Sequence, residues 1–283
     1  GCKAESIDLS DVDSSKVTDM SNMFDSSKML TIDLHNMILT PDVSEMFKGC
    51  KAESIDLSDV DSSKVTNMSN MFNGCSSLQS VDLSSFDTSN VTNLYRIFDG
   101  CSSLQSVDLS SFDTSNVTTL SYMFDGCSSL QSVDLRSFDT SKVTTLSYMF
   151  HGCSSLQSVD LSSFNTEKIT NVSHMFNGCS NITRLDLKNF VQERKWYMVY
   201  MFQDCANLEY LDISNMSINL HGHPTATMSG RTAMFKDTGK SVANKTEIRV
   251  NENSYNALMD AGDKYNYNAD YQKLVRPDGT VWE

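Results

Sequence analysis

One arrangement of apolar and polar positions recurs along most of the chain. In residues 101–126, the apolar residues Val107 and Leu109 stand on either side of Asp108. Alternation of this kind is typical of a short strand that is buried on one face and exposed on the other. The first half of each such segment therefore predicts a strand.

The second half of the same segment has a different spacing. Val117, Leu120 and Phe124 follow one another at i, i+3 and i+7, which is the spacing of one apolar face of a helix. Gly126 comes soon after Phe124, at a place where helices commonly end with a positive φ. This half predicts one or two helical turns, capped by a short oxygen side chain within residues 113–115.

The segment is one copy of an internal repeat. From Cys75 to Cys205 the cysteines stand 26 residues apart at every step, and residues 1–18 recur without change at 49–66. The first 48 residues are read as two shorter units of 24, in which Ser26 takes the cysteine position. A period of roughly 20 to 50 residues is typical of a solenoid, in which each coil packs only on its neighbours.

The predicted fold class is therefore an α/β repeat solenoid. We expect a leucine-rich-repeat-like, right-handed coil with a parallel β-sheet on one face and short helical turns on the other. The strands are expected at residues 7–9, 32–34, 55–57, 81–83, 107–109, 133–135, 159–161, 185–187, 211–213 and 248–250.

The repeat divides the chain into an array and a remainder. Residues 1–235 are expected to form the array, with about nine units of 24–26 residues and an insertion in the last one. Residues 236–283 are expected to form a C-terminal cap, because the last apolar layer of a solenoid must be covered. The chain opens in the middle of a unit, so we expect an N-terminal cap, a signal peptide or an anchor to lie outside it.

The repeated motif CxxLxxVDLSxFDTSxVTxLxxMFxG resembles the leucine-rich repeat of BspA-like bacterial surface proteins, including the related lipoprotein repeats of mycoplasmas. The resemblance covers about residues 1–235. It implies a secreted or wall-attached bacterial protein, and often an adhesin that binds host or matrix proteins. The family has no catalytic residues to transfer, so neither an enzyme nor a cofactor is expected.

Charge narrows the choice of partners. Lys and Arg number 22 against 36 Asp and Glu, which gives a net charge of -14. An acidic surface repels phosphate backbones and anionic lipid headgroups, so nucleic acid is not expected as a partner. No apolar run approaches the ~20 residues of a membrane span, so no membrane insertion is expected within this sequence.

The eight cysteines fall at one phase of the repeat and are expected to form an inward column. Buried free thiols are favoured, since free cysteine is among the most buried residue types. Disulfides between neighbouring coils stay open as the alternative, because coils ~4.8 Å apart satisfy the Cα separation of a disulfide. No zinc site is expected, because no CxxC pairs converge with a histidine, and no residue is assigned as a metal ligand.

An aspartate lies between the two apolar residues of every predicted strand except 248–250, where Arg249 takes its place, and this aspartate should face solvent. We expect these carboxylates to form an acidic strip, with some pKa values raised by mutual repulsion. Either the strip binds a basic protein surface or Ca²⁺, or each aspartate accepts hydrogen bonds from serine or main-chain N–H groups. The strip comprises Asp82, Asp108, Asp134, Asp160, Asp186 and Asp212.

Residues that depart from the repeat mark the candidate binding site. Aromatic and arginine side chains dominate interface hot spots, and the C-terminal third of the array holds most of these departures. The candidate residues are Arg184, Lys188, Trp196, Tyr197, Tyr200, Tyr210, His221 and His223. For Trp196 the alternative stays open that its ring packs inward and begins the transition to the cap. A further column on the predicted helical face, which either shields the core or binds a partner, comprises Arg96, Tyr122, Tyr148, His174 and Tyr200.

Two functions fit this sequence. One is a non-catalytic module, extracellular or on the bacterial cell surface, that binds a host or matrix protein or another cell-surface protein. The other is a structural spacer that projects another domain from the cell. Divergence in residues 179–235 favours binding, whereas the near-identical units of residues 75–178 favour the spacer.

Overall fold

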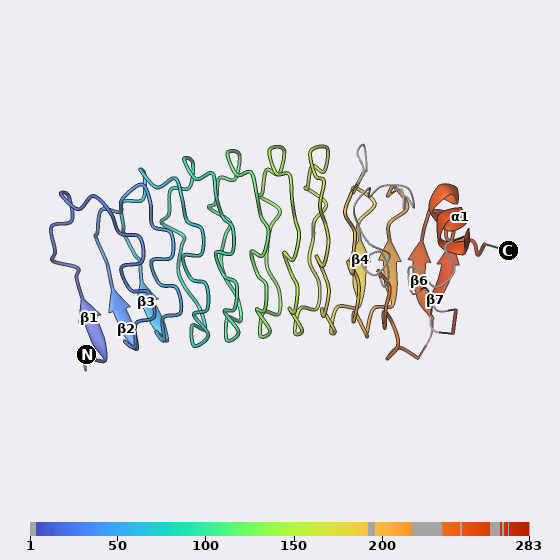
Figure 1. Ribbon diagram of the computed structural model, residues 1–283, viewed down its shortest axis with the longest axis horizontal. Coiled ribbons are helices and arrows are strands. Elements are labelled where there is room, and N and C mark those ends of the chain that lie inside the picture. The colour runs from blue at the N-terminus through green and yellow to red at the C-terminus, as the bar shows by residue number, and fades with distance from the viewer. Residues whose placement is uncertain are drawn as a thin grey trace.

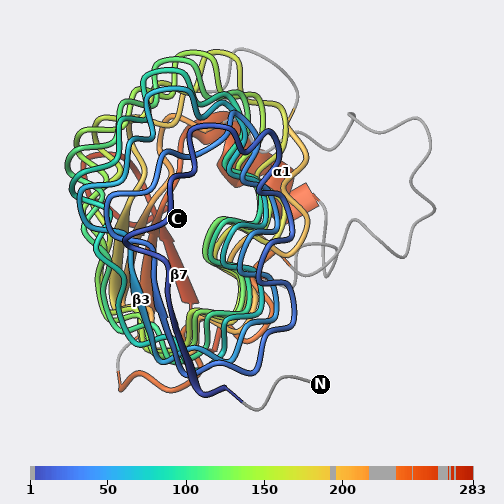
Figure 2. The ribbon, with the colours of Figure 1, turned by 90° about the vertical axis from the view of Figure 1, so that its left-hand side faces the viewer.

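The computed structural model describes residues 4–191, 196–216, 234–243, 245–260, 267, 269–270 and 272–282. The chain winds into a stack of coils along one axis, with the N-terminus at one end and the C-terminus at the other (Figure 1). Viewed end-on, the labelled strands lie on one wall of the stack (Figure 2). The opposite wall, made of consecutive turns, is called the turn face below. The prediction of a solenoid with a parallel sheet is confirmed.

Regular strands lie at the two ends of the array. The first three pair in sequence order as a parallel sheet, and the last four form a second parallel sheet in the same way. Equivalent apolar residues meet across each pair, as Ile32 does with Ile55 and Leu185 with Leu211. The strands are β1 (Ser6–Asp8), β2 (Thr31–Asp33), β3 (Ser54–Asp56), β4 (Arg184–Asp186), β5 (Tyr210–Asp212), β6 (Thr246–Arg249) and β7 (Gln272–Val275).

The four middle coils lack the strands that the sequence predicts. Residues 81–83, 107–109, 133–135 and 159–161 form no regular strands, although Leu83, Leu109, Leu135 and Leu161 still point into the core. On this wall the coils keep a main-chain bond at the glutamine position, such as Gln105 N–H to Gln79 O at 3.1 Å. The other main-chain hydrogen bonds between the middle coils lie mostly on the turn face, in place of the expected hydrogen bonds between strands.

The prediction of helical turns on the opposite face is wrong. The N–H groups of Tyr122, Phe124 and Gly126 donate to carbonyls of the next coil, at 2.9, 2.9 and 2.7 Å. The N–H groups between them close local turns instead, as Met123 N–H does on Leu120 O at 3.3 Å. Tyr122 and Gly126 have φ values of 60° and 70°, which no right-handed helix accommodates. Within the described residues the one α-helix is α1 (Glu252–Asp260).

Phenylalanine rings form the centre of the core. One ring from each successive coil stacks on the next, with centroids 5.4 to 6.0 Å apart and planes within 10° of parallel. Each aromatic contact of this type contributes roughly 0.5–1.5 kcal/mol beyond the area that it buries. The stack comprises Phe24, Phe47, Phe72, Phe98, Phe124, Phe150, Phe176, Phe202 and Phe235.

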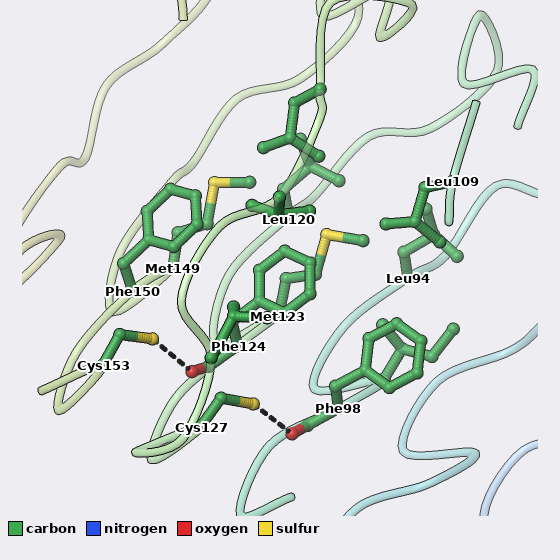
Figure 3. Close-up of a cluster of buried hydrophobic side chains, with 14 of the residues drawn as sticks. Leu94, Phe98, Leu109, Leu120, Met123, Phe124, Cys127, Met149, Phe150 and Cys153 are labelled. Atoms are coloured by element: carbon green, nitrogen blue, oxygen red, sulfur yellow. Dashed lines mark hydrogen bonds between the residues drawn. The ribbon is translucent and has the colours of Figure 1, made fainter. Parts of the chain in front are cut away.

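The cysteines line the core beside this stack (Figure 3). The Sγ of Cys127 donates to the carbonyl of Phe98 at 3.1 Å, and Cys153 reaches Phe124 in the same way at 3.0 Å. The seven cysteines that the structure describes are all buried free thiols. Burial raises the pKa of the Cys75 thiol to about 12. These thiols are therefore unreactive, because the core covers them and because the raised pKa keeps them protonated.

One assignment in the N-terminal units requires correction. Ser27, and not Ser26, takes the cysteine position, because its N–H bonds Phe24 O as Cys50 N–H bonds Phe47 O. Ser26 has a φ of 55° and corresponds to Gly49, whose φ is 66°. The two short units therefore differ in length, and the error arose from dividing them equally.

The chain beyond the array extends the sheet before it ends. Strand β6 pairs in register with β5, and β7 adds one further parallel strand. Helix α1 follows β6, and the ring of Trp282 stacks on Tyr255 with centroids 4.5 Å apart. A strand was expected at residues 248–250, whereas β7 was not predicted.

Thiol titration checks the cysteine column. Because burial raises the pKa of these thiols, we expect native protein to react at least about tenfold more slowly than free cysteine at pH ~8. After denaturation without a reductant, all 8 thiols of the sequence should react. Disulfides detected by mass spectrometry in the unreduced protein would contradict the structure.

Candidate functional site

Two of the predicted site residues meet on the C-terminal sheet. Arg184 on β4 pairs in register with Tyr210 on β5, and its guanidinium carbon lies 3.6 Å from the centre of the tyrosine ring. This position holds a serine in the coils before them. The equivalent residues are Ser80, Ser106, Ser132 and Ser158. A small polar position has thus become a stacked arginine–tyrosine pair.

A second arginine approaches the same ring from the next strand. Arg249 on β6 lies 5.2 Å from the centre of Tyr210 and also donates to Glu247 at 3.0 Å. Arg184 makes no ion pair with any residue that the structure describes. Burial, and then the charge of Asp212, raise the pKa of Tyr210, so the phenol stays protonated and donates to that carboxylate. We call Arg184, Tyr210 and Arg249 the arginine–tyrosine cluster.

The other predicted site residues do not join this cluster. Lys188 lies just after β4 and pairs with Asp186 at 3.4 Å. Tyr200 lies on the turn face, on the opposite wall of the solenoid. Tyr197 is 45% exposed. His221 and His223 lie outside the described residues.

Trp196 is a core residue, which corrects its assignment to a binding surface. Its side chain is 8% exposed and meets the edge of Phe190, with ring centroids 6.1 Å apart. A side chain buried to this degree has little surface left for a partner. The sequence around Trp196 marks this residue as a departure from the repeat, but it does not determine whether the ring faces the core or the solvent.

The acidic strip is held by local hydrogen bonds. Asp108 accepts the N–H of Ser110 at 2.9 Å, and Asp82 and Asp160 accept the equivalent serine N–H groups at the same distance. The side chain and then the main chain of that serine lower the pKa of each carboxyl. Our expectation of raised pKa values is therefore wrong. The carboxylates are exposed to water, so repulsion between coils is weaker than these bonds.

Arg136 makes Asp134 an exception within the strip. Its guanidinium donates to both carboxylate oxygens, with the closest approach at 2.7 Å. These bonds lower the pKa of Asp134 to about 2. Bidentate pairs of this kind are stronger than hydrogen bonds between neutral groups, which accounts for the larger shift.

The strip ends within the C-terminal sheet. Asp186 pairs with Lys188, and Asp212 is only 5% exposed and accepts bonds from Ser214 N–H and the Tyr210 hydroxyl. No group of three or more His, Cys, Asp or Glu among the described residues is arranged to hold a metal ion. Each coil contributes one carboxylate to the strip. Binding of Ca²⁺ to the strip stays a prediction.

The aromatic column predicted on the other wall forms a continuous stack. Tyr122 and Tyr148 have centroids 4.5 Å apart, His174 follows at 4.3 Å and Tyr200 at 4.9 Å. Arg96 closes one end, with its guanidinium carbon 4.3 Å from the centre of Tyr122. We call these five residues the turn-face ladder.

Every residue of the turn-face ladder has a left-handed backbone. Their φ values lie between 55° and 60°, a region that costs a bulky residue about 1–2 kcal/mol. Two of the N-terminal coils have asparagine in this conformation, at Asn22 and Asn70, where the cost is smaller. Stacking of the rings offsets part of the backbone cost in the later coils.

Three titratable residues that were not predicted as site residues lie beside the turn-face ladder. Asp99 pairs with Arg96 at 3.3 Å, and His151 Nδ1 lies 2.6 Å from Asp125. Burial, and then the Asp125 charge, raise the pKa of Asp99 to about 6. The 26-residue spacing of positions 99, 125 and 151 was the available signal, because it places all three in one column.

The comparisons with known proteins give one family. A profile described as "Mycoplasma protein of unknown function, DUF285" matches residues 2–40, 41–133 and 126–248. A solved structure, "Crystal structure of TLR13-ssRNA13 complex", is 18% identical with a TM-score of 0.35, over 80% of this chain and 32% of that chain. The match spans about a third of that chain, and at this TM-score it carries no conclusion. No curated protein matches.

None of the helices in the described residues has both the length and the apolar character that crossing a bilayer requires.

Replacing Arg136 by serine tests how the strip is held. Arg136→Ser restores the residue of the neighbouring coils, and we expect the pKa of Asp134 to rise from about 2 toward that of Asp108. The measurement is an NMR pH titration of the aspartate carboxyl carbons. Asp108 is the internal control and should not move. An unchanged Asp134 would show that the guanidinium bonds do not set its pKa.

Alanine substitutions separate core from surface beside the array's divergent coil. Trp196→Ala should lower the free energy of unfolding by about 3–5 kcal/mol, because it empties a buried site. Tyr197→Ala is the matched control and should change stability by less than about 1 kcal/mol, as is usual for exposed positions. Urea denaturation measures both. A small effect of Trp196→Ala would show that its ring is not packed in the core.

Proposed function

The chain belongs to the family described as Mycoplasma protein of unknown function, DUF285, and we propose that it is a non-catalytic, protein-binding repeat scaffold. Its place is the bacterial cell surface or the extracellular medium, and its partner is a host or matrix protein or another cell-surface protein. The BspA-like motif of the sequence supports this adhesive role. The family description itself names no activity.

The arginine–tyrosine cluster carries the proposal. Arg184 is exposed, stacked on Tyr210 and without an ion pair in the described part of the chain, so its charge is available to a partner. Arginine and tyrosine are enriched in the few residues that dominate interface energies. Stacking also fixes the guanidinium before binding, which reduces the entropy that a flexible side chain would lose.

The surrounding sheet supports the same location. The cluster lies on the four-stranded sheet β4–β7, where regular main-chain pairing provides a rigid support. Glu247 pairs with Arg249 of the cluster at 3.0 Å and with Lys273 at 3.5 Å, so Glu247 and Lys273 form a polar rim beside the cluster. An exposed arginine within a polar rim is suited to a partner that presents a carboxylate.

The second candidate function is a spacer. Residues 75–178 repeat almost without change, and their sheet wall presents only serines, glutamines and locally bonded aspartates apart from Arg136. Such hydrated groups offer little binding energy per contact. In this alternative the array sets a distance from the cell, and the arginine–tyrosine cluster stabilises the end of the sheet.

A binding assay with consensus substitutions tests the proposal. The wild-type chain is screened against immobilised matrix proteins and whole host cells, with and without Ca²⁺. Arg184→Ser combined with Tyr210→Ser restores the serine of the earlier coils at both positions. We expect the double variant to weaken binding by about 25-fold, which corresponds to the ~2 kcal/mol of a hot spot.

Arg136→Ser is the matched control, because it makes the same change to consensus in the middle of the array. It should leave binding unchanged within about twofold. If matrix proteins and cells fail to bind the wild type, adhesion is wrong and the spacer is favoured. If binding occurs but survives the double variant, the site lies elsewhere. Ca²⁺ dependence would implicate the acidic strip.

A further inference from the structure

Two partly buried titratable side chains lie at different points of the turn-face ladder. Asp99 lies beside Arg96, which closes the ladder at its N-terminal end. His174 lies within the ladder, between Tyr148 and Tyr200. Neither is required by the proposed function, and they respond to acid in opposite directions.

Asp99 is held where its ionised form is disfavoured. Its side chain is only 16% exposed, and Asp125 occupies the equivalent position in the next coil. Arg96 at 3.3 Å, Asn73 and His151 favour the charge, but burial and the charge of Asp125 outweigh them. Protonation removes a partly buried negative charge, so acid stabilises this part of the folded protein.

His174 is held in its neutral form. Its ring stacks on Tyr148 with centroids 4.3 Å apart and faces Tyr200 at 4.9 Å. The amide nitrogen of Asn177 can only donate, so Nδ1 of His174, 3.0 Å away, accepts this bond and carries no proton.

The charged neighbours do not favour a second proton on His174. From the previous coil, His151 approaches its ring edge-on with centroids 6.1 Å apart. Asp125, one coil further, favours the proton, but His151 lies between them and pairs with it at 2.6 Å. On the following coil Asp204 is the nearest charged residue in sequence to Tyr200, and it accepts a bond from Gln203. A proton on His174 is therefore opposed by burial of the ring and by the charge of His151.

We propose that acidification redistributes stability along the solenoid, tightening the coil of Asp99 and loosening the coil of His174. The loosened coil directly precedes the coil that carries Arg184 on β4. A partner bound at that end would therefore meet a less rigid support in acid. The array becomes a proton-sensitive device whose response depends on position along its axis.

The signs follow from the pKa values of the two groups. Burial, followed by the charge of His151, lowers the pKa of His174 from 6.5 to about 4, so the stability contributed by its neutral form is lost as the pH falls between these values. The pKa of Asp99 is raised from 3.8 to about 6, so stability is gained as the pH falls through 6. The two effects oppose each other in nearly the same window, and a global melting curve would conceal both.

Local amide exchange resolves them. At pH ~7 and pH ~5, with correction for intrinsic exchange, the amides of His174 and Phe176 should lose about tenfold in protection. The amides of Phe98 and Gly100 should gain about fivefold. These amides are informative because each donates to a carbonyl of the next coil, at 2.8, 3.0, 3.0 and 2.6 Å.

Two consensus variants provide the controls. His174→Tyr installs the residue of the coils on both sides and should abolish the acid-induced loss at its own coil while leaving the gain at Asp99. Asp99→Asn installs the residue found at Asn73 and Asn177 and should abolish the gain alone. His174→Asn, matching Asn22 and Asn70, replaces the tyrosine variant if that variant fails to fold.

Either of two results would overturn the inference. One is that protection in the wild type changes in the same direction at both coils. The other is that His174→Tyr retains the acid-induced loss. Neither result depends on whether the protein binds a matrix protein, so failure here is distinct from failure of the proposed function.

Discussion

Main-chain hydrogen bonding between successive coils on the turn face fixes the register of this protein. Phe98, Phe124 and Phe150 each donate their N–H to the residue 25 positions later, Met123, Met149 and Met175, at 3.0, 2.9 and 2.9 Å. A constant offset places equivalent residues of neighbouring coils directly above one another. The phenylalanine stack, the cysteine column and the turn-face ladder all follow from that alignment. A single disturbed turn would displace every column at once.

This constraint explains which parts of the structure were predictable. A repeat of 26 residues requires like residues to stack, so the inward Phe124 and Cys127 and the outward Asp108 followed from the sequence. The type of turn did not follow. Val117, Leu120 and Phe124 have helical spacing, but a series of tight turns also brings residues at this spacing to one wall. Tyr122 gave no warning, because bulky aromatic residues rarely have positive φ.

In the candidate site, too, some features followed from the repeat and others did not. Arg184 and Tyr210 were identified because they break the serine column, and parallel register then placed one on the other. Trp196 broke the pattern as clearly but turned inward, because a large apolar ring gains more from burial than from exposure. The bond from Ser110 to Asp108 matches the hydrogen-bonded alternative that the sequence left open, whereas the expectation of raised pKa values considered only repulsion between coils and is wrong.

Stacking of like residues also determines where function can arise in such an array. A side chain that matches its neighbours is held on both sides, as Tyr148 is between Tyr122 and His174. Specific chemistry therefore requires a coil that departs from the column. His174 replaces a tyrosine, His151 takes the position held by Asp125, and Arg184 replaces a serine. These departures lie in consecutive coils beside the C-terminal sheet, so the same region that offers a distinctive surface also contains His174, the histidine whose neutral form the stack favours.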